Sequence, residues 1–113
     1  MIRYRRIFLE NKSKAETFIG FAVKSGKFRS GANTLATLNK AYLILVCETA
    51  AENTKQLAEK YAGKYRCRVF CTKGRTLSDI AHKDGIKIAA ITDLSLAKAV
   101  IDNAECLTET VGR

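Results

Sequence analysis

A short basic stretch that ends in small residues is the part of this chain whose residue types best suit binding chemistry. Lys27 and Arg29 lie just before the pair Ser30-Gly31, and Asn33 follows two residues later. Lysine and arginine attract phosphate, and small residues at a helix start let a ligand approach backbone N–H groups, which also favour anions. The amide of Asn33 suits the edge of a base. The stretch indicates contact with a polyanion, although a helix hairpin with solvated lysines has the same pattern.

A second basic loop precedes another expected helix start. Lys73 and Arg75 lie in this loop, and the apolar Leu77 and Ile80 follow. An apolar side chain at that position suits packing against an unstacked base, as recognition of structured RNA requires. Core packing accounts for Leu77 equally well, so both interpretations stay open.

Residues that catalysis or metal binding needs are sparse in this sequence. Cys67 and Cys71 fall on one face of an expected strand, but neither a histidine pair nor a second cysteine pair accompanies them, which favours core packing over zinc. His82 is the single histidine and has no nucleophile motif near it. The sequence has no glycine-rich loop of the nucleotide-binding types. We expect no enzymatic activity, no cofactor and no metal site.

The charge of the chain favours a polyanionic partner. Twenty Lys and Arg against eleven Asp and Glu give a net charge of +9 in 113 residues. Solubility needs fewer charges than this, so nucleic acid is the expected partner and a solvated surface is the alternative. No apolar run approaches the roughly 18 residues that a membrane span needs. The four cysteines are too sparse for a disulfide scaffold and no secretory signal is evident, so we expect a cytoplasmic protein with reduced thiols and no membrane partner.

Helical and extended patterns alternate along the chain and must position these residues. We expect helices over 13–25, 32–40, 49–62, 76–82 and 93–101, and strands over 41–47, 66–71 and 86–91. Gly26 and Gly63 follow two of these helices, and the Ser13–Glu16 and Thr49–Glu52 pairs form capping boxes. Thr76 and Asp93 are expected to cap the last two helices. The alternation predicts a single α/β domain, a three-layer α-β-α sandwich with a sheet of about four strands. An arm over 1–12 precedes the domain at 13–103, and a tail over 104–113 follows it.

Four blocks of sequence carry a family resemblance in their order and spacing. They are Lys24-x-Gly26-Lys27 with Ser30-Gly31, then Ala50-Ala51-Glu52-Asn53-Thr54-Lys55, Ile88-Ala89-Ala90-Ile91-Thr92-Asp93, and Ala97-Lys98-Ala99-Val100. From about Phe18 to Asn103 the chain resembles the ribosomal L-seven-Ae / L-thirty-e family, and its small basic bacterial members most of all. The resemblance implies an α-β-α sandwich that binds kink-turn RNA, a sharply bent duplex with tandem G·A pairs next to a bulge.

The resemblance also implies where RNA would bind. In this family RNA meets the start of the second helix through a Gly-x-Asn-Glu-x-x-Lys-like motif, which Gly31 and Asn33 match. Thr34 and Thr37 stand where the family has a glutamate and a lysine. Each base-edge hydrogen bond lost in this way is worth about 1–3 kcal/mol of discrimination. The segment that follows is shorter than in typical relatives, so Lys40 takes part of the missing lysine's space.

A second family contact comes from the loop before a short helix. Leu77 and Ile80-Ala81 match this region, whereas Ser78 and His82 replace two family glycines. Losing glycine removes freedom at positive φ and close approach of the backbone. We therefore expect general RNA binding to be better supported than kink-turn specificity.

These observations together predict a non-enzymatic RNA-binding protein of a ribosome or another ribonucleoprotein. Its partners would be structured RNA of the kink-turn type, with ribosomal RNA as one candidate, and other components of the ribonucleoprotein. The predicted RNA-binding residues are Lys27, Arg29, Ser30, Gly31, Asn33, Thr34, Thr37, Lys40, Lys73, Arg75, Leu77, Ser78 and Ile80. The alternative is a protein-interaction module on the same fold whose RNA motif has decayed.

Overall fold

Helices and strands alternate along the chain as the sequence predicts. The computed structural model describes residues 14–73, 76–103 and 107–109. In chain order the elements are α2 (Lys14–Lys24), β1 (Phe28–Ser30), α3 (Ala32–Ala36), β2 (Leu43–Val46), α4 (Glu52–Tyr65), β3 (Arg68–Thr72), α5 (Leu77–Ala81), β4 (Ile88–Ile91), α6 (Leu94–Asp102) and β5 (Leu107–Glu109). The strands form one mixed sheet in the order β1-β4-β2-β3-β5.

The sheet is built around two short apolar strands. Every residue of β2 and of β4 is buried, as expected for strands that are covered on both faces. These strands pair antiparallel, with Leu43 opposite Ile91 and Val46 opposite Ile88. β3 runs parallel to β2, and β1 runs antiparallel to β4. Consequently β1, β2 and β3 all point the same way, and the loops that follow them gather at one end of the sheet.

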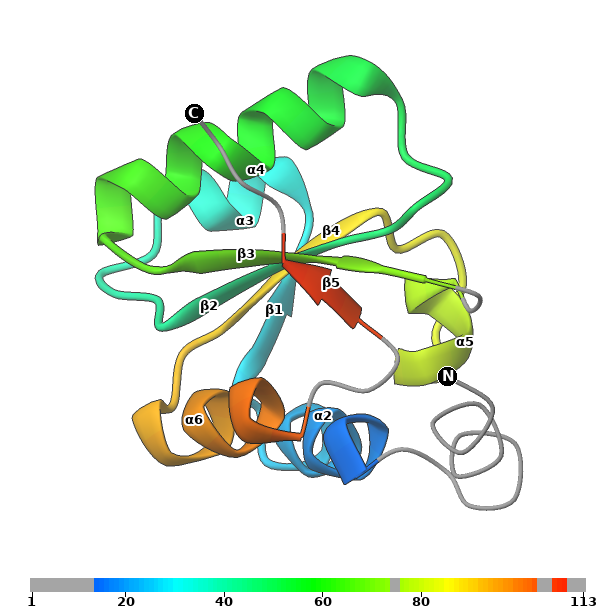
Figure 1. The fold of residues 1–113 in the computed structure, drawn as a ribbon. Coiled ribbons are helices and arrows are strands. Elements are labelled where there is room, and N and C mark those ends of the chain that lie inside the picture. The colour runs from blue at the N-terminus through cyan, green and yellow to red at the C-terminus, as the bar shows by residue number, and fades with distance from the viewer. Residues whose placement is uncertain (1–13, 74–75, 104–106, 110–113) are drawn as a thin grey trace.

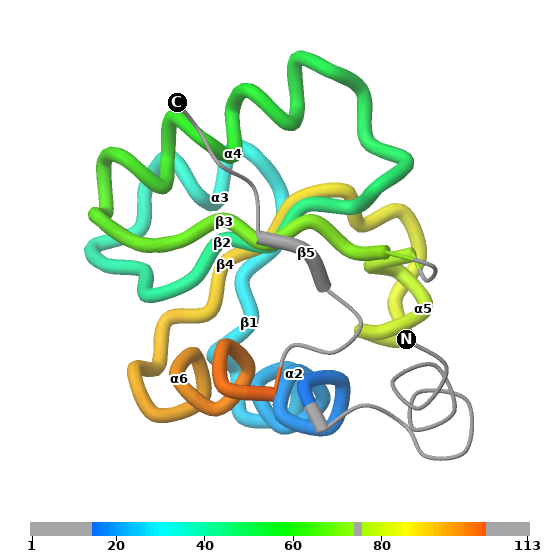
Figure 2. The backbone as a smooth tube through the Cα atoms, viewed as in Figure 1, coloured from blue at the N-terminus to red at the C-terminus, as the bar shows by residue number. Residues whose placement is uncertain are grey.

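Helices cover both faces of this sheet. Figures 1 and 2 show α3 and α4 on one face and α2 with α6 on the other, while α5 lies at one end of the strands. Ile19 of α2, Leu35 of α3, Ala58 of α4 and Val100 of α6 are all fully buried against the sheet or each other. This arrangement is the predicted three-layer α-β-α sandwich.

Among the described residues the sheet has five strands, against the expected number of about four. Two of them, β1 at 28–30 and β5 at 107–109, lie where no strand was predicted. The sheet therefore continues past the predicted domain boundary at residue 103. The expected arm over 1–12 lies outside the described residues. In the described part of the chain, the helices are too short or too polar to span a bilayer.

Several helix ends follow the predicted local signals. Gly26 takes the left-handed conformation after α2, with φ 76°. The Thr76 hydroxyl accepts a hydrogen bond from the backbone N of Asp79 at 3.1 Å and caps α5. Asp93 caps α6 in the same way, accepting from the backbone N of Leu96 at 2.9 Å. These caps depend on neighbouring residues alone, which is why the sequence reveals them.

Other helix ends correct the sequence predictions. The Thr49 capping box is wrong, because the Thr49 hydroxyl contacts Cys47 Sγ and Lys87 Nζ, and α4 begins later with Ala51 as an N-cap that has no side-chain bond. Gly63 does not end α4. The helix runs on to Tyr65, and Arg66 takes the left-handed conformation with φ 58°. α3 is also shorter than the predicted 32–40, and the Ser13 capping box falls outside the described residues.

Candidate nucleic-acid interface

Lys27 lies where the chain leaves α2 and enters the edge strand β1. Its backbone N donates to Ala22 O at 2.8 Å, and its carbonyl oxygen accepts from the backbone N of Thr92 at 2.9 Å. The Thr92 hydroxyl lies 3.3 Å from the same oxygen. These bonds tie the Lys27 backbone to α2 on one side and to the β4–α6 loop on the other. The exposed Lys27 side chain therefore projects from a backbone that hydrogen bonds hold in place.

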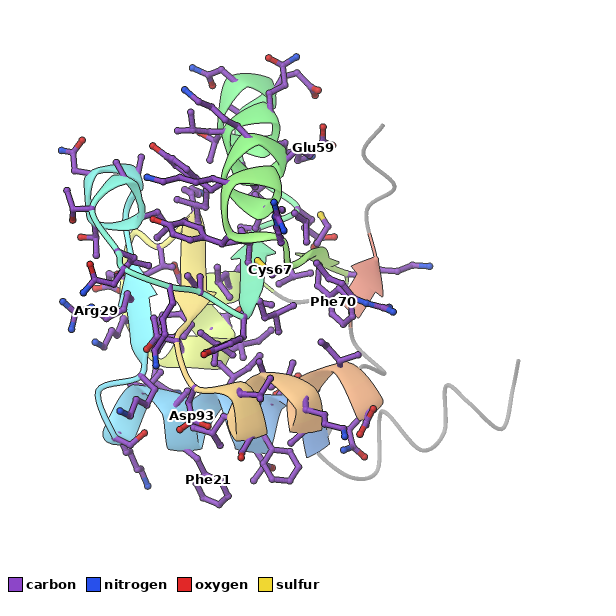
Figure 3. All side chains as sticks on the ribbon, turned by 90° about the vertical axis from the view of Figure 1, so that its left-hand side faces the viewer. Phe21, Arg29, Glu59, Cys67, Phe70 and Asp93 are labelled. Atoms are coloured by element: carbon purple, nitrogen blue, oxygen red, sulfur yellow. The ribbon has the colours of Figure 1, made fainter. Side chains whose placement is uncertain are left out.

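Arg29 is the middle residue of β1. The strand buries Phe28 on one face and exposes Arg29 on the other, as side-chain alternation requires. Among the described residues β1 pairs with β4 alone, so it forms one edge of the sheet that the structure describes. Figure 3 shows Arg29 at the outer side of this strand, away from the core. A cation at an edge strand also discourages pairing with another chain.

Lys40 completes a cationic group with Lys27 and Arg29. The three residues border a shallow hollow of about 220 Å3, whose other lining residues are Gly26, Leu38, Asn39 and Thr92. No Asp or Glu is among the described residues that line this hollow. Lys40 Nζ lies 5.8 Å from the centre of the Tyr42 ring, within the range of a cation–π contact. We call Lys27, Arg29 and Lys40 the edge cations.

The segment that matches the family motif lies at the other end of β1. Gly31 has φ 98° and donates its N–H to Ile88 O at 3.0 Å, so this N–H belongs to the sheet and is not offered to a ligand. Asn33 is exposed and Thr34 is half-buried. Thr37 follows the last residue of α3, and its hydroxyl donates to Thr34 O at 3.1 Å. Of these side chains, the amide of Asn33 is the one placed to read a base.

The end of α3 is held by two side chains from α4 that sequence reasoning missed. The Tyr65 hydroxyl lies 2.5 Å from Leu35 O and 3.0 Å from Leu38 O. Lys64 Nζ donates to Ala36 O at 3.0 Å. These contacts satisfy carbonyl groups that a short helix leaves without internal partners. They join residues about 30 positions apart, so no local pattern signals them.

A second hollow, of about 330 Å3, lies beside Gly31. It is lined by Ser30, Gly31, Ala32, Thr54, Asp84, Gly85, Ile86, Lys87 and Ile88. Lys87 was not predicted as a binding residue, and its Nζ donates to the Thr49 hydroxyl at 2.8 Å. Its position just before a buried strand is the one sequence signal that would have placed it at this end of the sheet. The hollow also contains a carboxylate, so it is less cationic than the edge group.

The second predicted contact needs correction in part. Leu77 is fully buried and Ile80 is 2% exposed, so both side chains belong to the core and offer no surface to an unstacked base. The Ser78 hydroxyl is also engaged within the protein, at 3.0 Å from Ile86 N and 3.4 Å from Ile86 O. Lys73 is exposed, as expected for a loop cation, and Arg75 lies outside the described residues. At this contact the described part of the chain therefore keeps Lys73 alone as an available side chain.

His82 occupies the place of a family glycine and still takes the glycine-like conformation. Its φ is 57° and its ψ is 40°, and its backbone N–H reaches Ser78 O beyond the end of α5. The expectation that losing this glycine prevents positive φ is therefore wrong. The left-handed conformation costs energy in a residue with a side chain, so strain is stored at this position.

The structure divides the predicted residues into two groups. Lys27 and Lys40 lie where β1 begins, whereas Ser30, Gly31 and Asn33 lie where it ends, and Arg29 stands between them. The two groups are separated by one three-residue strand, or about 10 Å. A ligand that contacts both must therefore follow the β1 edge.

The described cysteines differ in their surroundings. Burial raises the pKa of Cys67 from 9.0 to about 11, and burial also raises the pKa of Cys71. For Cys47, burial acts upward, but hydrogen bonds from Thr49 and the Leu77 N–H outweigh it and lower the pKa. In the described residues, His, Cys, Asp and Glu form no cluster that could hold a metal ion.

Comparisons with known proteins support the fold and leave the function open. No protein-family model and no curated protein matches the chain. A solved structure, described as a protein with unknown function from Bacillus halodurans, superposes with a TM-score of 0.72 at 16% sequence identity. The match covers 80% of this chain and 96% of the other. The likeness at this identity concerns the α/β fold alone.

Proposed function

We propose that this chain is a non-enzymatic RNA-binding protein that recognises structured RNA of the kink-turn type in a ribosome or another ribonucleoprotein. The observation that carries the proposal is the group of edge cations, Lys27, Arg29 and Lys40, around a hollow whose described lining residues include no carboxylate. The net charge of +9 supports the same partner, as does the resemblance of four sequence blocks to the ribosomal L-seven-Ae / L-thirty-e family.

The physical argument rests on phosphate contacts. Lys27 stands on a backbone that is hydrogen-bonded on both sides, and Arg29 stands on a paired strand, so ordering these side chains costs less than it would in a free loop. An arginine or lysine that neutralises a phosphate releases counterions. Backbone contacts of this kind position a nucleic acid and carry no base specificity.

Specificity would come from the other end of β1. Asn33 is exposed there beside the hollow at Gly31, and Lys87 adds a cation. An RNA that reaches both groups must run along the β1 edge for about 10 Å. The preference for a bent, kink-turn RNA comes from the family resemblance and not from this distance. Because Thr34 and Thr37 replace the charged residues of the family motif, we expect weaker base discrimination than the family motif gives.

The test is the salt dependence of RNA binding by two double variants. Lys27→Gln/Arg29→Gln removes two edge cations, and Lys60→Gln/Lys98→Gln removes two exposed lysines of α4 and α6 that line neither hollow. Each phosphate contact contributes about 0.7–0.9 to the log–log salt slope, so the first variant should lose about 1.4–1.8. The control should change the slope little. If the two double variants have equal salt slopes, the edge cations do not contact the RNA.

The alternative function is a protein-interaction module on the same fold. Two large apolar side chains favour it, because Phe21 of α2 is 49% exposed and Leu94 of α6 is 61% exposed. An interface built on apolar side chains responds little to salt, whereas phosphate contacts weaken steeply. Failure of the protein to bind RNA even at low salt would favour this alternative.

A further inference from the structure

A third groove lies at the end of the sheet where β2 and β3 begin. It has a volume of about 520 Å3 and lies between the end of α4, the segment before β2 and the helix α6. Its lining residues are Asn39, Lys40, Ala41, Tyr42, Lys64, Tyr65, Arg66, Cys67, Arg68, Leu94 and Ile101. In Figure 3 this end of the sheet faces the viewer, with Cys67 between α4 and α6. The groove is at the opposite end of the strands from the hollow beside Gly31, because Leu43 and Ile91 pair here while Val46 and Ile88 pair there.

The lining of this groove has one sign of charge. Four of its residues are lysine or arginine, and no Asp or Glu is among the described residues that line it. Two of the cations lie against aromatic rings, since Lys40 Nζ is 5.8 Å from the Tyr42 ring centre and Lys64 Nζ is 5.2 Å from that of Tyr65. Lys64 Nζ also donates to Ala36 O at 3.0 Å, which uses one of its three N–H donors. Neither this bond nor the ring contacts neutralise the lysines. The groove therefore favours an anion.

The aromatic residues indicate which kind of anion the groove would bind. Tyr42 is half-buried, and its hydroxyl has no hydrogen-bond partner among the described residues. Its ring packs in part against the hydrophobic core, and Lys40 lies over it at the distance given above. A base that stacks on an aromatic side chain gains more than an exposed cation–π contact supplies. A base can therefore displace Lys40 from the ring, and the released ammonium can turn to the phosphate. A flat base with a phosphate beside it fits this pairing of rings and cations.

Arg66 is placed to meet that phosphate by the way α4 ends. It takes the left-handed conformation with φ 58°, which turns the chain sharply between α4 and β3 and leaves the side chain exposed at the mouth of the groove. The chain holds a strained arginine where glycine would be the relaxed choice. The charge at this position thus comes with a conformational cost.

We propose that this groove binds an unpaired segment of single-stranded RNA, with a base on Tyr42 and phosphates on Arg66 and Lys64. The volume falls within the range of about 300–1,000 Å3 that is usual for small-ligand sites, so one or two nucleotides fit. The inference goes beyond kink-turn recognition, because only Lys40 is shared with the edge cations. An RNA that leaves the β1 edge as a single strand would find this second contact beside it.

The test uses the full chain and a short labelled oligouridylate at low and near-physiological salt. Arg66→Gly removes the charge and keeps the left-handed turn, so it should lower affinity and reduce the salt slope by about 0.7, the value for one phosphate of a single strand. Tyr42→Leu should weaken binding at least about fivefold and leave the slope unchanged, because stacking is not ionic. Lys60→Gln, the same loss of charge on α4 outside the groove, should change neither quantity.

The proposal is overturned if Arg66→Gly and Lys60→Gln bind the oligouridylate alike, or if Tyr42→Leu binds as tightly as the parent. An acidic oligopeptide that displaces the oligouridylate at equal concentration would also overturn it, in favour of a protein partner. If uridine monophosphate competes as well as the oligomer, the ligand of the groove is a free nucleotide and not a segment of RNA. Binding of kink-turn RNA, measured in parallel, depends on Lys27 and Arg29, so failure of one site is distinguishable from failure of the other.

Discussion

Removing one oxygen atom from Tyr65 should loosen α3, the helix that carries the motif residues. The Tyr65 hydroxyl lies 2.5 Å from Leu35 O and 3.0 Å from Leu38 O, but it has a single hydrogen and can donate to one of them at a time. Tyr65→Phe keeps the ring and its packing and deletes this bond. A net hydrogen bond contributes about 0.5–1.5 kcal/mol, so the free energy of unfolding should fall by about this amount.

Urea denaturation of the variant measures the global effect, and amide exchange measures the local one. The N–H of Leu35 donates to Gly31 O and that of Thr37 donates to Thr34 O, so both report on α3. If the bond holds the end of this helix, these amides should exchange about two- to tenfold faster in Tyr65→Phe. Amides in β2 should change only as much as global stability does.

Tyr42→Phe is the matched control for this experiment. It makes the same chemical change at a half-buried tyrosine whose hydroxyl has no partner among the described residues. It should alter the free energy of unfolding by no more than about 0.5 kcal/mol, as for a surface substitution. Equal stability of the two variants, with unchanged exchange in α3, would refute the claim that Tyr65 anchors this helix.

Three further outcomes follow from other local features. Asp93→Ala should cost about 1 kcal/mol of stability, because the Leu96 N–H loses its acceptor, and an unchanged urea midpoint would contradict the cap. His82→Gly should stabilise the protein by about 0.5–1 kcal/mol by relieving positive φ, whereas His82→Ala should not; a destabilised glycine variant would speak against strain there. Because burial raises the pKa of Cys67 from 9.0 to about 11, its thiolate fraction at pH 8 is roughly a hundredth of the ordinary one. In a variant with Cys67 as its sole cysteine, thiol modification should be slower by that order in the folded protein than in urea, and equal rates would contradict this burial.

Signals that depend on near neighbours were readable from the sequence. The continuous apolar runs of β2 and β4 and the caps at Thr76 and Asp93 all appear in the structure as predicted. The predicted end of α4 was wrong because Gly63 is a local helix-stop signal. In the folded protein, tertiary packing outweighs that signal. Tyr61 and Ala62 are buried and Tyr65 reaches α3, so continuing the helix gains tertiary contacts that no local pattern reveals.

The candidate site likewise combines features that the sequence predicts with features that only the fold reveals. Charge and exposure of Lys27, Arg29 and Lys73 were predictable, because cations in links and loops face solvent. Burial of Leu77 and Ile80 was not, since a short helix with apolar residues suits a core and a ligand surface equally well until its neighbours are known. The groove at Tyr42 and Arg66 is assembled from segments far apart in the chain, so its residues share no motif.

The most direct test of the RNA-binding account is a titration of the full chain with a kink-turn RNA and with a copy whose G·A pairs are replaced. At near-physiological salt we predict clear binding to the first, weaker binding to the second, and loss of this difference in Asn33→Ala. Equal, salt-sensitive binding to both RNAs would leave a general RNA-binding protein without kink-turn specificity. Absence of binding to either RNA at low salt would contradict the account.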